Sequence, residues 1–266
     1  MCRPIVYLCD LDGTLLNKQA VIEPEVRKRL NRLIRRGLHI TFITARDLES
    51  TIRILSGVQM NLPFAVCNGC LIVSPLNGEI CKAWHHSYAA VQAILKAAEG
   101  ISLPRVTRYN AQQVKGLLRQ HLSRSLNDGS ITQEYIFSVA FRDTADRIHE
   151  IRSRVMNLED PSLFLQCYND PFEEEIHILD ITAASGNKGS AVRHISEILN
   201  IPVSHMVAIG DGENDLEMFR AAGAHCVVGD HPVVNRLYGD CKIIYDEGIS
   251  VVDFIEQQFL STSRTL

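Results

Sequence analysis

The sequence of 266 residues lacks a long apolar run, and it also lacks an excess of basic residues. No apolar segment approaches the roughly 20 residues that a membrane-spanning helix needs, so we expect no contact with a membrane. The formal net charge is −4 and the sequence pI is about 6.2, whereas a general nucleic-acid-binding protein usually carries a basic surplus. We therefore expect nucleic acid to be no partner of this chain.

We expect no export signal either. The apolar stretch near the N-terminus is short and meets Asp10 and Asp12 at once, so it predicts a core strand of a cytoplasmic protein and not a signal peptide. There is no internal repeat or low-complexity segment. Hydrophobic residues are 46% of the chain and charged residues 22%, which is typical of a globular protein with one large core or two smaller ones.

Cysteine is present eight times, mostly in apolar, strand-like segments. Without an export signal, this pattern favours small buried thiols over disulfides. Cys67 and Cys70 form a single CxxC, which leaves a zinc site or a redox pair open. A lone CxxC is weak support for either, and we favour two thiols at a strand end beside a turn.

Strands and helices alternate in the first third and in the last quarter of the chain, which predicts a parallel sheet wound right-handedly. The expected fold class is α/β, a Rossmann-like doubly wound sheet. Apolar runs predict strands at 4–10, 39–44, 64–67, 205–210, 225–229 and 242–246. Apolar residues at helical spacing predict helices at 24–37, 48–55, 187–200 and 213–223.

The middle of the chain has a different pattern, in which neighbouring strands would pair antiparallel. We expect helices at 87–99, 111–124 and 144–156, a loop at 127–130, and strands at 135–141, 163–169 and 175–181. These elements indicate an α+β domain at 82–185, inserted between the third and fourth strands of a core made of 1–81 and 186–266.

Acidic residues follow two of the predicted core strands. Asp10 and Asp12 come at the end of the first strand, two residues apart and therefore on one face. Asp211 follows the strand at 205–210, and Asp215 lies four residues later at the start of the next helix. Open α/β sheets bind ligands at the carboxyl ends of their strands. Four carboxylates there require a hard cation such as Mg²⁺.

A hydroxyl group and a cationic group belong to the same edge of the sheet. Thr44 ends the second strand, so its hydroxyl can meet a ligand beside Asp10. Lys188 opens the helix that returns the chain to the core. A solvated surface is the commoner place for a single lysine, but here its charge can neutralise both a carboxylate and a phosphate.

These residues resemble the four ordered motifs of the haloacid-dehalogenase phosphatase superfamily. The motifs are "DLDGT" at 10–14, Thr44, Lys188 and "GDGEND" at 210–215. The large insert, with "NG" at 68–69 just before it, resembles the Cof-type sugar-phosphatase group. The first and fourth motifs are specific, whereas a lone threonine or lysine is not.

The resemblance implies a mechanism. Asp10 would attack phosphorus and form an aspartyl-phosphate, and Asp12 would protonate the leaving alcohol and then activate water. Mg²⁺ would be held by Asp10, the backbone carbonyl of Asp12 and Asp211, with Asp215 as a ligand or an orienting group. Thr44 and the backbone N–H groups of Leu11 and Asp12 would bind the phosphoryl oxygens, and Asn214 would orient Asp211 or the phosphate.

The insert would then be a cap that excludes water and chooses the substrate. Candidate contacts to the substrate, each of which is more often a surface or packing residue, are Arg46, Asn68, Gly69, Arg142, Tyr168 and His177. The basic run from Lys115 to Arg124 can attract an anionic substrate, although a solvated helix face is the more common explanation.

Three functions fit these residues. The first is a Mg²⁺-dependent phosphatase acting on a small phosphorylated metabolite, such as a sugar phosphate. The second is a phosphomutase or phosphotransferase that uses the same site. The third is a sensor that binds phosphate ligands without turnover, against which all four motifs being intact argues. The sequence sets neither the physiological substrate nor the oligomeric state.

Overall fold

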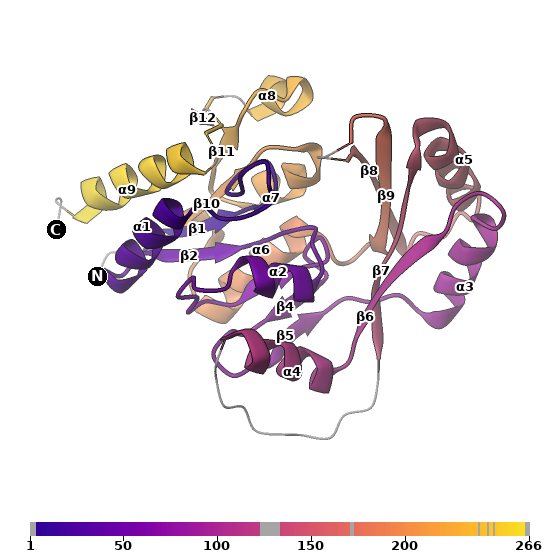
Figure 1. Ribbon diagram of the computed structural model, residues 1–266, viewed down its shortest axis with the longest axis horizontal. Helices are drawn as coiled ribbons and strands as arrows, with labels where there is room; N and C mark the ends of the chain where they lie inside the picture. Colours follow the sequence, from indigo (N-terminus) through magenta and orange to yellow (C-terminus); the bar gives the residue numbers. More distant parts are fainter. Residues whose placement is uncertain are drawn as a thin grey trace.

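The computed structural model describes residues 4–122, 134–170, 173–238, 240–243, 245–246 and 248–263. Its main sheet has five strands in the order β12-β11-β10-β1-β2, and all neighbours pair parallel (Figure 1). The strands are β1 (Val6–Cys9), β2 (His39–Phe42), β10 (Met206–Gly210), β11 (Ala224–Val228) and β12 (Lys242–Ile243). The predicted α/β fold with a parallel sheet is confirmed.

Helices cover both faces of this sheet because its central strand is apolar on both sides. Tyr7 and Cys9 of β1 belong to one buried cluster, together with residues of α1 (Pro24–Arg35), α2 (Leu48–Ile54) and α9 (Ile249–Ser263). Val6 and Leu8 belong to a second cluster on the opposite face. That cluster contains residues of α6 (Lys188–Leu199), α7 (Leu216–Ala221) and α8 (Pro232–Tyr238). The sheet is therefore doubly wound, as expected.

The third predicted strand pairs differently from the prediction. β3 (Phe64–Val66) forms an antiparallel sheet with β4 (Leu71–Val73) and β5 (Ile80–Ala83), and it touches the main sheet through one parallel bridge, Ile43 to Ala65. The reason is the tight turn after β3, where Cys67, Asn68 and Gly69 all have positive φ angles. This turn sends the chain straight back, so β4 pairs antiparallel with β3, while β3 keeps only a short parallel contact with the residues that follow β2.

The insert contains a four-stranded antiparallel sheet in the order β6-β7-β9-β8. Its strands are β6 (Pro104–Tyr109), β7 (Tyr135–Thr144), β8 (Leu163–Asn169) and β9 (Ile176–Ala183). The helices α3 (Tyr88–Ala97) and α5 (Ala145–Met156) cover the side that faces away from the parallel sheet (Figure 1). The antiparallel pairing is confirmed, whereas β4, β5 and β6 have no counterpart among the predicted strands. The predicted loop at 127–130 lies outside the described residues.

One helix of the insert packs on the core. Helix α4 (Ala111–Leu122) contacts α2, and its side chains Val114 and Leu118 are buried in the same cluster as β1. The insert is thereby fixed to the core by an apolar contact as well as by the chain connections at its two ends. The boundaries 82 and 185 stay a prediction.

The cysteine prediction is wrong for one pair. Cys226 and Cys241 form a disulfide, because β11 and β12 are neighbouring parallel strands and bring the two Cα atoms to 4.7 Å. Cys67 and Cys70 are free and buried at the turn after β3, and the Cys70 thiol donates to the backbone oxygen of Gly186. The interpretation of the CxxC as thiols beside a turn agrees with this geometry.

Within the described ranges, no helix is both long and apolar enough to cross a membrane.

Candidate active site

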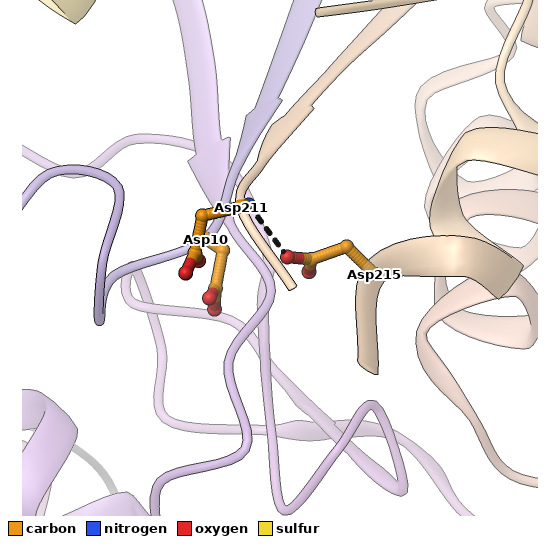
Figure 2. A group of neighbouring side chains, drawn as sticks. All are labelled: Asp10, Asp211 and Asp215. Carbon is orange, nitrogen blue, oxygen red and sulfur yellow. Dashed lines mark hydrogen bonds between the residues drawn. The ribbon is translucent and has the colours of Figure 1, made fainter. Parts of the chain in front are cut away.

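Three carboxylates converge at the carboxyl edge of the parallel sheet (Figure 2). Asp10 directly follows β1 and Asp211 directly follows β10, and these two strands are neighbours. Asp215 lies in the 3₁₀ turn η2 (Glu213–Asp215) that leads into α7. One oxygen from each of the three groups lies within 4.8 Å of the other two. Among the residues that the structure describes, this is the only such group of possible metal ligands.

Lys188 lies against this cluster. Its Nζ atom is 2.8 Å from Oδ1 of Asp10 and 2.6 Å from Oδ1 of Asp215, and the side chain is 1% exposed. Lys188 is the first residue of α6, which begins at an N-cap where the Asn187 side chain accepts a hydrogen bond from the Ser190 N–H. The ammonium group therefore reaches the carboxylates from the start of a helix on one face of the sheet.

Gly69 allows the start of α6 to approach so closely. A Cβ atom at this position would lie 2.5 Å from the Asn187 carbonyl oxygen and 2.9 Å from the Lys188 nitrogen. The φ angle of Gly69 is +91°, which also favours glycine. This contact explains the "NG" motif by packing, and it places Gly69 behind Lys188.

The charges of the cluster do not balance. When all three carboxylates are ionised, the single ammonium group leaves two negative charges uncompensated. Burial raises the pKa of Asp10 to about 7 although Lys188 opposes the shift, and burial also raises the pKa of Asp211, with Asp215 and Asp10 adding to it. Burial alone would lower the pKa of Lys188, but the two carboxylates beside it outweigh burial and raise that pKa. A buried cluster with this charge and these oxygen ligands fits a divalent cation.

Backbone groups and glycines fix the acids in place. The N–H groups of Asp211 and Gly212 donate to Oδ2 of Asp215 at 3.0 and 3.2 Å, and the Thr14 hydroxyl donates to Oδ1 of Asp211 at 3.1 Å. A Cβ atom on Gly13, whose φ is +69°, would lie 2.1 Å from Oδ2 of Asp211. The glycine in "DLDGT" therefore leaves room for the acid of the other motif.

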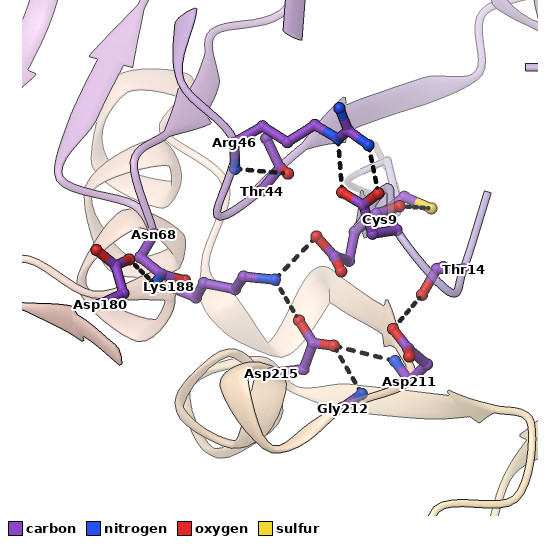
Figure 3. A network of polar contacts seen from close by, with 12 residues as sticks. Cys9, Thr14, Thr44, Arg46, Asn68, Asp180, Lys188, Asp211, Gly212 and Asp215 are labelled. Atoms are coloured by element: carbon purple, nitrogen blue, oxygen red, sulfur yellow. Dashed lines mark hydrogen bonds and ion pairs between the residues drawn. The ribbon is translucent and has the colours of Figure 1, made fainter. Parts of the chain in front are cut away.

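Asp12 has a different partner. Arg46 holds it in a two-pronged ion pair, in which Nε donates to Oδ2 and Nη2 donates to Oδ1, both at 2.6 Å. The Thr44 hydroxyl accepts a hydrogen bond from the backbone N–H of Arg46 at 3.2 Å and is fully buried (Figure 3). The Asp12 carboxylate is thus separate from the cluster formed by Asp10, Asp211 and Asp215.

A cavity of about 690 Å³ opens between this edge of the parallel sheet and the four-stranded sheet. On the core side its lining includes Asp10, Asp12, Arg46, Asp211 and Asn214. On the insert side its lining includes Arg105, Ser138, Arg142, Tyr168 and Asp180. A ligand in the cavity therefore touches both parts of the molecule at once.

A buried hydrogen-bond network joins the insert to the core beside this cavity. The Asn68 side chain donates to Oδ2 of Asp180 at 2.6 Å, and the Ser138 hydroxyl donates to Oδ1 of the same residue. Burial raises the pKa of Asp180, and the hydrogen bonds from Ser138 and Asn68 oppose that shift. Asn68 is not among the described residues that line the cavity, but Asp180, to which it donates, is. Asn68 is therefore connected to the cavity only through Asp180.

The structure brings most of the predicted site residues together. Arg142 lies at the cavity, where it is paired with Asp170 and Glu173 at 2.6 Å each. His177 lines a neighbouring cavity instead. The Leu11 side chain is buried in the core, so only the backbone of this residue can contact a ligand. Of the basic run from Lys115 to Arg124, the residues beyond position 118 have side chains outside the described part.

Several residues of the site have no counterpart in the sequence prediction. Thr14 is the last residue of the first motif, so the motif could have indicated that it belongs to the site. Ser50, Ser138 and Asp180 are joined to the site through Arg46 and Asn68. No local pattern marks them, because their place depends on how the two sheets face each other.

Comparison with known proteins agrees with the motifs. Residues 7–233 match the family model of the haloacid dehalogenase-like hydrolases, and the chain belongs to that family. A 5-amino-6-(5-phospho-D-ribitylamino)uracil phosphatase from Bacillus subtilis is 22% identical to it over 97% of this chain and 98% of its own. The chain is therefore a haloacid dehalogenase-like hydrolase, and the Bacillus subtilis relative is named as a phosphatase.

Solved structures show the same fold. A haloacid dehalogenase-like hydrolase from Bacteroides thetaiotaomicron superposes with a TM-score of 0.76 at 18% identity, over 96% of this chain and 100% of its own. A subclass IIB sugar phosphatase of the superfamily superposes with a TM-score of 0.66 at 17% identity, over 93% and 96% of the two chains.

Proposed function

We propose that this chain is a Mg²⁺-dependent phosphatase that hydrolyses small phosphorylated metabolites, sugar phosphates or similar compounds, through an aspartyl-phosphate on Asp10. One observation carries the proposal: two carboxylates with different partners, Asp10 on Lys188 and Asp12 on Arg46, line the same cavity. A double displacement at phosphorus needs one carboxylate that attacks and another that moves the proton.

The metal ligands in this proposal are Asp10, Asp211 and the backbone carbonyl of Asp12, with Asp215 as a ligand or an orienting group. The two excess negative charges of the cluster equal the charge of Mg²⁺, and carboxylate oxygens are the ligands that this ion prefers. When bound, Mg²⁺ supplies the positive charge that lets an anionic phosphate approach Asp10.

Each residue of the site then has its own role in the two steps of the proposed reaction. An oxygen of Asp10 attacks phosphorus, while Lys188 compensates the charge of Asp10. The P–O bond to the leaving group breaks, and Asp12, which must enter this step as the neutral carboxylic acid, donates its proton to the departing oxygen and becomes the carboxylate. Asp12 then takes a proton from water, which attacks the aspartyl-phosphate and releases inorganic phosphate. Thr44 and the backbone N–H groups of Leu11 and Asp12 bind the phosphoryl oxygens in both steps.

The remaining cavity holds the leaving group. We propose that the insert at 82–185 acts as a cap over the core segments 1–81 and 186–266, excludes water and selects the substrate. Arg142, Tyr168 and Asn214 line the cavity and are available for direct contact. Asn68 and Gly69 support this site from behind, through Asp180 and Lys188.

The test is turnover of p-nitrophenyl phosphate with Mg²⁺, repeated with EDTA and with Asp10→Asn. We expect phosphate release that is lost with EDTA and lost in the variant, and a phosphoenzyme that reacts with hydroxylamine. Asp253→Asn, a half-exposed acid on α9, is the matched control and should keep full activity. Turnover that survives Asp10→Asn would exclude the proposed nucleophile.

The same assay separates the two other functions. Adding an alcohol as acceptor would yield a new phosphate ester from a phosphotransferase, whereas a phosphatase releases inorganic phosphate. A protein that binds inorganic phosphate but turns over no phosphate ester would be a sensor.

A further inference from the structure

All three nitrogens of the Arg46 guanidinium group donate hydrogen bonds to protein groups near the start of α2. Nε and Nη2 donate to the two oxygens of Asp12 at 2.6 Å, and Nη1 donates to the Ser50 hydroxyl at 2.9 Å. Each of the three guanidinium nitrogens therefore has a protein partner. The side chain is 20% exposed, so its position is set by these contacts and not by solvent.

The backbone of Arg46 is fixed as well. Its N–H donates to the Thr44 hydroxyl at 3.2 Å, and its carbonyl oxygen accepts from the Cys67 N–H at 2.8 Å. Arg46 is therefore anchored to the ends of β2 and β3 through its backbone and to α2 through its side chain. It is a rigid support that points at Asp12.

Asp12 depends on that support. In the part of the chain that the structure describes, its carboxylate has hydrogen bonds to the two Arg46 nitrogens and to no other side chain. Asp12 is 29% exposed and lines the cavity, so without Arg46 its χ angles would be free to rotate. Asp10, in contrast, is held by burial and by Lys188.

We propose that Arg46 is a positioning residue that aims the Asp12 carboxyl group at the leaving-group oxygen, and that it acts on the reaction through Asp12 alone. The inference rests on the proposed function, in which Asp12 transfers the proton. Two parallel N–H···O bonds fix both the place and the plane of a carboxylate, which the single ammonium group of a lysine does not do.

The competing interpretation is that Arg46 binds the substrate directly, because it also lines the cavity. The two interpretations differ in the substrates for which kcat/KM should fall when Arg46 is replaced. A poor leaving group needs a well-placed proton donor, whereas a good one departs with little help. Loss of a direct contact would weaken all substrates of the same shape alike.

The experiment compares phenyl phosphate with p-nitrophenyl phosphate, which have the same ring but leaving groups of different basicity. We measure kcat/KM, which reports the steps up to departure of the leaving group, for Arg46→Lys and Arg46→Gln. Proton transfer by a positioned group contributes about 10²–10⁴-fold to the rate. We therefore expect kcat/KM of the Arg46 variants to fall at least about ten-fold more for phenyl phosphate than for p-nitrophenyl phosphate. Arg53→Gln, an exposed arginine of α2, is the matched control and should change neither substrate.

A double variant completes the test. If Arg46 acts only through Asp12, then Asp12→Asn/Arg46→Gln should have the same kcat/KM as Asp12→Asn alone. Equal losses on both phenyl esters, or a further loss in the Asp12→Asn background, would overturn the positioning role. These outcomes are separate from those of Asp10→Asn, since turnover that depends on Asp10 leaves the proposed function intact whatever Arg46 does. Unfolding temperatures of all variants verify that each one is folded.

Discussion

Asp10 is placed where its ionised form is disfavoured unless a cation is bound. Its side chain is buried beside two other carboxylates, and Lys188 compensates only part of their charge. Functional sites often contain groups that are unfavourable for folding but required for activity. The cluster therefore links the stability of the metal-free protein to pH.

The first prediction concerns this link. Burial raises the pKa of Asp10 to about 7 in the folded state, above its ordinary value of 3.8. Between these values the folded protein retains a proton that the unfolded chain releases, so the contribution of Asp10 to the free energy of unfolding falls as pH rises from about 4 to about 7. We expect denaturant unfolding in EDTA to show this decrease in the wild type and a smaller one in Asp10→Asn.

In the same experiment at pH 8, Asp10→Asn should be more stable than the metal-free wild type, because it removes one of the repelling charges. A variant that is less stable at pH 8, or that has the same pH dependence as the wild type, would contradict this account.

The second prediction concerns Gly13, whose missing side chain leaves room for Asp211. Gly13→Ala would place a methyl group 2.1 Å from Oδ2 of Asp211 at a φ of +69°, so the loop or the carboxylate must move. We expect a loss of Mg²⁺ affinity of at least about ten-fold by calorimetric titration, since disturbing the groups that orient a metal ligand typically costs 10–100-fold in affinity.

Gly37→Ala is the control for Gly13→Ala. Gly37 also has a positive φ, +96°, but a Cβ atom there meets nothing within 4 Å. Its substitution should lower stability by about 1 kcal/mol and leave Mg²⁺ binding unchanged. Equal Mg²⁺ affinity in both variants would show that Gly13 acts on the backbone alone.

At the scale of elements, the core strands that carry the motifs could be predicted from the sequence. The runs at 4–10 and 205–210 are apolar, and an aspartate ends the first and directly follows the second. Such continuous apolar runs are typical of buried parallel strands. Pro24 at the start of α1 and Gly37 after its end likewise set the bounds of that helix locally. The strand pairing of β3 was not predictable in this way, because it depends on the turn at Cys67 and Asn68.

The contact between α4 and α2 is another feature that sequence periodicity does not contain. An apolar stripe shows that a helix is buried, but not which neighbour buries it. Val114 and Leu118 pack on the core, although the surrounding sequence belongs to the insert. Such a partner is determined only when the whole chain is folded.

The third prediction tests this contact. Leu118 is 1% exposed, so Leu118→Ala should lower the free energy of unfolding by about 2–5 kcal/mol through lost burial and the cavity left behind. Denaturant unfolding measures this change. Gln112→Ala, at an exposed position of the same helix, should be neutral. A Leu118→Ala protein as stable as the wild type would show that α4 does not hold the insert to the core.

At the scale of the whole molecule, the candidate site combines parts with very different sequence separations. The acids and Lys188 were found from motifs, because their chemistry fixes their spacing to strand and helix ends. The link from Asn68 to Asp180 spans 112 residues and joins two separate sheets. It was not predictable, because nothing near Asp180 in the sequence shows which turn of the core it will face.

The fourth prediction concerns ligand binding by the molecule as a whole. In the proposed function Mg²⁺ binds the folded cluster and not the unfolded chain, so it should stabilise the protein by mass action, by about 2.7 kcal/mol at a concentration 100 times its Kd. Thermal unfolding at increasing Mg²⁺ should show a rising midpoint. Asp211→Asn should reduce this rise, and Asp253→Asn should not. A thermal unfolding midpoint that does not change with the Mg²⁺ concentration would argue against a metal site in the cluster.

The order of strands in the main sheet has a consequence for protein synthesis. β1 is made first but lies between β2 and β10, and β10 begins only at Met206. During synthesis, the edge of β1 that pairs with β10 therefore stays unpaired until about three quarters of the chain has been made. An unpaired strand edge can form hydrogen bonds with other chains. Nascent chains that stop before β10 would carry Asp10 without Asp211 and Asp215, so we expect them to be inert and prone to aggregate.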